Sequence, residues 1–254
     1  MSNEHPTYPN PTIIESVCDI HFRLSQGQQW KSSLAGELFK HIQNEYPEME
    51  PVLEMGLQLE VGPTGAATQI LPQSQKFRFK HKVRPIILQL AENSFSISTL
   101  PPYQGWEVMR NDILAAWEQV IDILAPEAIN RMGLRYINRF MMGTPETRLG
   151  EWLRANYYIP NSILHSKPGF FLREQVRLDT ENVLIITLGD VKTDLNSGQG
   201  AVVFDIDRIV EKEMSLEQTI FQSVLEQLHT DVWDVFSSSK GEKLESLLRG
   251  NSDE

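Results

Sequence analysis

Arginines recur at every fourth position in the stretch NRMGLRYINRF, which is the first pattern in this sequence that could do chemistry. If the stretch is a strand, Arg131, Arg135 and Arg139 lie on one of its faces. Arg173 and Arg177 share a face of a later expected strand. Guanidinium groups bind carboxylates and phosphates through paired hydrogen bonds, so these five arginines are candidate ligands for an anionic group.

Two aspartates offer a different chemistry. Asp205 and Asp207 share a face of the expected strand VVFDIDRI, where two carboxylates can hold Mg²⁺ or Mn²⁺ and activate water. The candidates to complete such a site are His229, Asp231 and Asp234 on the last long helix. This alternative is a metal-dependent hydrolase or nuclease, although a bare Asp-x-Asp pattern is unspecific.

The same charges also have a structural interpretation, in which they pair with one another across neighbouring strands. Three arginines in a row repel one another, and opposite charges on an adjacent strand relieve this repulsion. We expect Asp205 and Asp207 to be the favoured partners of the row. Arg135, at its centre, is expected to be the most buried of the three.

The sequence lacks the motifs of the common catalytic classes. It contains no Walker loop, no G-x-G-x-x-G and no G-x-S-x-G stretch. Cys18 falls on the apolar side of an expected strand, which favours a core residue over a nucleophile. We therefore favour a non-enzyme and predict no cofactor.

Composition restricts the partners and the compartment. The 254 residues include 23 basic and 34 acidic ones, and the formal net charge of −11 argues against general nucleic-acid binding and fits a basic protein partner. No apolar run approaches the roughly 20 residues that span a bilayer. The N-terminus lacks a signal-peptide pattern and there is one cysteine, so we predict a cytoplasmic protein.

The elements that must position these side chains recur in two similar sets. Residues 13–24 alternate as a strand, and an amphipathic helix, further strands and a second helix follow before Pro126. The pattern restarts at residues 128–141 and closes with a long helix that is expected to begin at a Ser215 cap. We predict an α+β fold of antiparallel sheets with helices on one face.

This order divides the chain into a disordered tail (1–11), an N-terminal α+β half (12–126) and a C-terminal α+β half (127–254). The two halves would have similar topology and pack as one unit, and residues 13–24 and 128–140 would be corresponding strands. A small-molecule sensor with a pocket between the halves is a further functional interpretation.

Five stretches carry a resemblance to a known family: NPTIIESVCDIHF, PPYQGWEVMRNDI, RMGLRYINR, VFDIDR and LHTDVWDVFSSS. In this order, over nearly the whole chain, they resemble a sporadically distributed family of bacterial conserved hypothetical proteins. GLRYINR and the Tyr103-Gly105-Trp106 segment are the most specific. The resemblance implies no catalytic residues. The patchy occurrence of the family implies a defence or toxin–antitoxin-like setting, so we expect a binding or accessory protein that engages a protein partner or an anionic ligand.

Overall fold

The computed structural model of the chain describes residues 5–54, 57–62, 65–70, 74–142, 148–165, 169–192 and 200–251. Its strands are β1 (Ile13–Leu24), β2 (Glu48–Glu54), β3 (Leu57–Gly62), β4 (Gly65–Ile70), β5 (Ser74–Lys80), β6 (Ile86–Leu90), β7 (Ser94–Thr99), β8 (Pro126–Met141), β9 (Phe171–Arg177), β10 (Asn182–Lys192) and β11 (Gly200–Val210). Its helices are α1 (Ser32–Ile42), α2 (Trp106–Leu124), α3 (Leu149–Trp152), α4 (Asn161–Leu164), α5 (Gln218–Ser239) and α6 (Glu242–Leu248). Within these ranges, no helix combines the length and the apolar character needed to cross a membrane.

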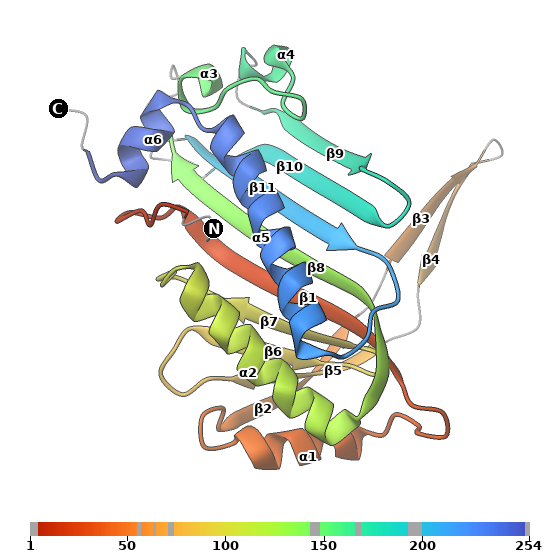
Figure 1. Cartoon of the computed structure of the whole chain (residues 1–254). Coiled ribbons are helices and arrows are strands. Elements are labelled where there is room, and N and C mark those ends of the chain that lie inside the picture. Colours follow the sequence, from red (N-terminus) through yellow and green to blue (C-terminus); the bar gives the residue numbers. More distant parts are fainter. Residues whose placement is uncertain are drawn as a thin grey trace.

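Nine strands form one antiparallel sheet in the order β2-β5-β6-β7-β1-β8-β11-β10-β9. The two longest strands, β1 and β8, pair near its centre, with Ser16 opposite Tyr136. Strands β3 and β4 form a separate hairpin that projects from the body of the molecule (Figure 1). The predicted α+β class with a large antiparallel sheet is therefore confirmed.

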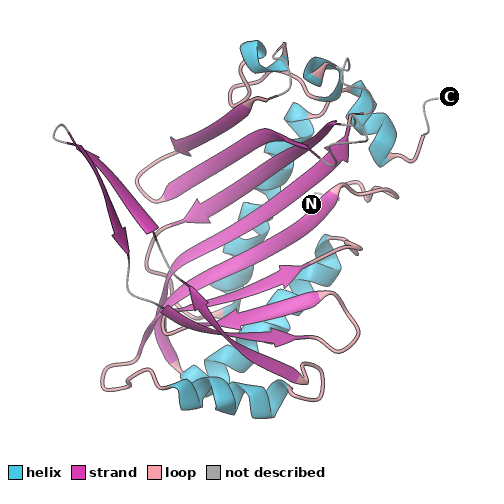
Figure 2. Cartoon of the chain, turned by 180° about the vertical axis from the view of Figure 1, so that it is seen from behind, coloured by secondary structure: helices cyan, strands magenta, loops and turns pink. Residues whose placement is uncertain are grey.

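The three longest helices, α1, α2 and α5, lie on one face of the nine-stranded sheet (Figure 1), and the view from behind shows the strands in front of them (Figure 2). The core lies between these two layers. On one side Trp117 of α2 packs on Phe22 of β1, with 5.8 Å between ring centroids. On the other side Phe236 of α5 packs on Phe204 of β11 at 6.2 Å.

Helix α2 is fixed on the sheet by apolar residues at helical spacing. Each of these is at most 3% exposed: Met109, Ile113, Trp117, Val120 and Leu124. The helix ends at Ala125, whose φ of 41° lies in the left-handed region, and Pro126 then opens β8. Helix α2 is therefore packed on the sheet along its whole length.

Helix α5 begins at Gln218 and not directly after Ser215, as the capping-box spacing had predicted. Met214 forms an isolated bridge with Ile129 of β8, through hydrogen bonds of 2.7 and 3.0 Å. This bridge holds the chain extended just before Ser215. The Ser215 hydroxyl instead accepts a hydrogen bond from the Glu217 amide at 3.3 Å, which caps a turn ahead of the helix.

Candidate ligand-binding site

The arginines of β8 point away from the helices, because they alternate with buried residues such as Leu134 and Tyr136. Arg135 donates two hydrogen bonds to the Asp205 carboxylate, from Nε at 2.8 Å and from a terminal nitrogen at 2.7 Å. Arg131 forms an ion pair with Asp19 of β1. Two arginines of the row are thus paired within the protein. Arg135 pairs with the expected partner Asp205, and Arg131 pairs with Asp19, which was not expected.

The expectation that Arg135 is the most buried of the row was wrong. Its side chain is 44% exposed, whereas that of Arg131 is 28% exposed. The residues opposite Arg135 on the neighbouring strands, Val17 and Asp207, have short side chains. The longer arginine side chain therefore extends past them to the surface, and the buried member of the ion pair is Asp205, at 5% exposure.

The remaining candidate arginines lie on this surface but do not converge on one point. Arg139 is exposed. Arg173 donates to the Thr187 hydroxyl at 3.1 Å, and Arg177 lies 3.6 Å from a Glu211 carboxylate oxygen. Strand β9 is three places from β8 in the sheet, which is roughly 14 Å at the usual strand spacing. The five arginines therefore do not form a single pocket for a small anion.

The structure does not assemble the alternative metal site. Phe204 and Ile206 are buried on the α5 side of β11, so Asp205 and Asp207 point to the opposite face. Candidates on α5 cannot complete their coordination through the sheet. In the described part of the chain, no group of three His, Cys, Asp or Glu side chains is placed to hold a metal ion. Burial raises the pKa of Asp207 to about 6, against the opposing effect of the nearby Arg135 and Arg131.

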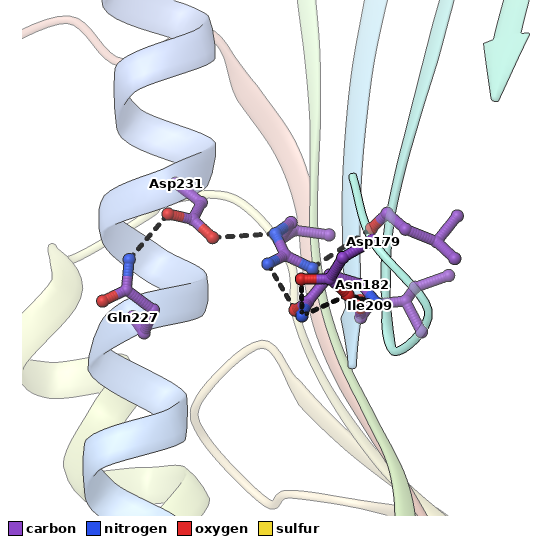
Figure 3. A network of polar contacts seen from close by, with 7 residues as sticks. Asp179, Asn182, Ile209, Gln227 and Asp231 are labelled. Atoms are coloured by element: carbon purple, nitrogen blue, oxygen red, sulfur yellow. Dashed lines mark hydrogen bonds and ion pairs between the residues drawn. The ribbon is translucent and has the colours of Figure 1, made fainter. Parts of the chain in front are cut away.

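Asp231, one of the expected metal ligands, has a different partner that the sequence reading did not identify. Arg208 of β11 is only 5% exposed and donates its Nε hydrogen to Asp231 at 2.8 Å (Figure 3). Its terminal nitrogens donate to the Ile209 carbonyl at 2.6 Å and to Asn182 at 2.7 Å. The network anchors α5 on the sheet. The sequence did contain a sign of this network, because Arg208 occupies a position on the apolar face of an alternating strand.

The principal cavity among the described residues lies on the helix side of the sheet, between α2 and α5. Its volume is about 1110 Å³. Tyr136, Asn138 and Ile206, from the central strands β8 and β11, contribute to its floor. Trp106 of α2 and Trp233 of α5 also line the cavity. Elements from both ends of the chain therefore meet at this cavity.

Aromatic rings form part of the cavity wall. Trp106 and His229 stack face to face across the two helices, with ring centroids 4.0 Å apart and planes inclined by 2°. The hydroxyls of Tyr103 and Tyr136 are 3.0 Å apart, within hydrogen-bond distance. These flat surfaces favour ring-shaped apolar groups, which gain area burial and stacking energy from such contacts.

The polar groups of the cavity are mostly matched within the protein. Glu226 of α5 accepts hydrogen bonds from the Trp106 indole and from Arg110, both at 3.0 Å. The Thr12 hydroxyl donates to Asn138 at 3.0 Å. Burial, followed by the neighbouring His5, lowers the pKa of His229 to about 3, so this ring is neutral at pH 7. The cavity therefore combines aromatic rings with hydrogen-bonding groups and with the charged side chains of Glu107, Arg110 and Glu226.

The tail expected to be disordered covers part of this cavity. Residues 5–11 belong to the described chain and lie against α5 and α6. The Tyr8 hydroxyl donates to Glu245 at 2.8 Å, and the Asn10 amide donates to the Leu248 carbonyl at 3.1 Å. The rings of His5 and Tyr8 also contact Trp233, and these aromatic contacts help to hold the tail on the protein.

A comparison of the sequence with protein-family models finds no match, and a comparison with curated proteins finds none either. The geometry of the cavity is therefore the main guide to function.

Sequence reasoning pointed to the arginine face and missed most of the cavity. Trp106 was named only within the family resemblance, and His229 was considered only as a metal ligand. Two signals were present. Trp233 falls off the main stripe of its helix, and the Tyr103-Gly105-Trp106 segment was among the most specific parts of the family resemblance.

Proposed function

We propose that this chain is a non-catalytic binding protein that takes a small organic molecule in the cavity between α2 and α5. The observation that carries the proposal is the cavity of about 1110 Å³ walled by aromatic rings. Pockets for drug-sized ligands have volumes of about 300–1,000 Å³ and combine apolar walls with a few polar groups. The walls described above have this character.

We further infer that the two halves of the chain correspond, with the cavity at their junction. The strand orders β1-β7-β6-β5 and β8-β11-β10-β9 run outward from the centre in the same sequence, which supports this inference. Helix α2 closes the first half and α5 the second. A ligand between them would contact both halves, as a small-molecule sensor requires.

A protein partner on the opposite face of the sheet is a second candidate function. It is supported by Phe171, which is 71% exposed on the edge strand β9, and by the exposed Arg139 and Arg173 on the same side. The family resemblance supports a defence-associated setting for this proposal, and the composition supports a cytoplasmic one. In that setting, ligand binding in the cavity would control an accessory protein.

A blocked-cavity variant tests the small-molecule proposal. Thr230 lines the cavity from α5, so Thr230→Trp fills part of its volume. Ser223→Trp adds the same side chain at an exposed position of the same helix and serves as the control. In a thermal-shift screen of neutral aliphatic and aromatic metabolites, we expect some to raise the melting temperature of the wild type and of Ser223→Trp.

The same compounds should leave the melting temperature of Thr230→Trp unchanged. Stabilisation of all three proteins by the same compounds would place the binding elsewhere. A screen in which no compound stabilises the wild type would contradict the proposal itself.

A further inference from the structure

The N-terminal segment already places an aromatic ring in the candidate site. The imidazole of His5 lies 4.9 Å from the ring of Trp233, inclined by 33°, and 5.1 Å from that of His229, inclined by 62°. Tyr8 stacks on Trp233 with centroids 6.2 Å apart. Rings of α5 thus hold a small nitrogen heterocycle that belongs to the protein itself.

Hydrogen bonds fasten the segment at Tyr8 and Asn10, whereas His5 is held by ring contacts. Asn10 is hydrogen-bonded through its main chain and its side chain to carbonyls of α6, at 3.1 and 3.0 Å. Lys240 lies over the Tyr8 ring and is 2.6 Å from a carboxylate oxygen of Glu245. Within the described chain, His5 has ring contacts and no hydrogen bond. The His5 ring is therefore held less firmly than Tyr8 and Asn10.

Resting on the proposed function, we propose that His5 occupies the place of a flat, neutral nitrogen heterocycle and that this ligand enters by displacing the His5 side chain while Tyr8 and Asn10 stay bound. The internal ring shows which chemistry the subsite accepts: a planar aromatic group that stacks on Trp233 and meets the edge or face of His229. An aliphatic ring of similar size lacks this stacking. The segment then acts as a competitor that lowers the apparent affinity for the ligand.

This competition has a measurable size. When only a fraction of the molecules has an open site, the apparent dissociation constant rises by the inverse of that fraction. If the subsite is open in about a tenth of the molecules, truncating the His5 ring should tighten binding about tenfold. The remainder of the cavity is unchanged by that truncation.

Isothermal titration with benzimidazole tests the inference, and cyclohexanol serves as the non-aromatic comparison. We expect His5→Ala to lower the Kd for benzimidazole about tenfold relative to the wild type, with little effect on cyclohexanol. His41→Ala removes an exposed histidine on α1, outside the cavity lining, and should match the wild type. Adding Trp233→Ala to His5→Ala should abolish the gain. If the Trp233→Ala variant does not fold, Trp233→Leu can be used in its place, because leucine keeps an apolar side chain at this position.

An unchanged or raised Kd in His5→Ala would overturn the inference, as would the absence of benzimidazole binding in every variant. Thr230→Trp distinguishes this failure from failure of the proposed function. If Thr230→Trp removes binding while His5→Ala has no effect, the cavity is the site and the gating is wrong. If Thr230→Trp leaves benzimidazole binding intact, the site lies elsewhere and both proposals fail.

Discussion

At the scale of single residues, the ion pair between Arg135 and Asp205 shows how charge is distributed on the helix-free face. The arginine is 44% exposed, whereas the aspartate side chain is only 7% exposed. A buried carboxylate depends on its partner more than an exposed guanidinium does, because an unpaired buried charge keeps its desolvation cost. The pair is thus asymmetric, and removal of the arginine should be the harmful change.

We expect Arg135→Ala to lower the free energy of unfolding by about 1–3 kcal/mol, because it leaves Asp205 without its two hydrogen bonds. Arg139→Ala, an exposed arginine on the same strand, should change it by no more than about 0.5 kcal/mol. Urea denaturation of both variants measures the difference. Adding Asp205→Asn to Arg135→Ala should restore part of the loss, and equal stability of Arg135→Ala and the wild type would refute the internal pairing.

His229 provides a pH-dependent test of the cavity wall. Its pKa is about 3 in the folded protein and near 6.5 when unfolded, so the unfolded state binds the extra proton between these values. The contribution of the neutral ring to stability is complete above about pH 6.5 and is lost as the pH falls, by at most about 1.4 kcal/mol per pH unit.

The variant His229→Phe keeps a ring against Trp106 and cannot be protonated. Denaturation curves at pH 7, 6, 5 and 4 should show that the wild type loses more stability than this variant as the pH falls from 7 to 4. Parallel loss in the two proteins would mean that His229 is not buried as a neutral ring.

At the scale of elements, local periodicity in the sequence predicted individual strands and helices well. It could not predict contacts between segments that are far apart in the sequence. The alternation in residues 13–24 and the helical stripe ending at Leu124 predicted β1 and α2 closely. Residues 1–11 were predicted to be a disordered tail, of which residues 1–4 lie outside the described chain and residues 5–11 are ordered. Their order comes from contacts with α5 and α6, more than 200 residues away in the sequence, which no local pattern can indicate.

The candidate site was only partly accessible from sequence for the same reason. Strand alternation correctly placed Arg131, Arg135 and Asp205 on one face, since the side-chain period of a strand is fixed. The cavity instead depends on the distance between α2 and α5 above the sheet. The face-to-face contact between Trp106 and His229 joins residues separated by more than 120 positions, and only the sheet order brings them together.

At the scale of the whole molecule, α2 and α5 pack on a continuous sheet and leave a large aromatic cavity between them. We propose that this cavity is a ligand site. The indole groups of the protein allow a direct test, because Trp106 and Trp233 line the cavity while Trp117 and Trp152 are buried elsewhere. Each indole N–H gives its own signal in a proton–nitrogen correlation spectrum.

The decisive measurement is a titration of the labelled protein with benzimidazole, phenol and cyclohexanol, followed through the five indole signals. We expect the signals of Trp106 and Trp233 to shift in a saturable manner with at least one compound, while those of Trp30, Trp117 and Trp152 stay in place. Shifts spread evenly over all five indoles, or no saturable shift of Trp106 and Trp233 with any compound, would contradict a ligand site between α2 and α5.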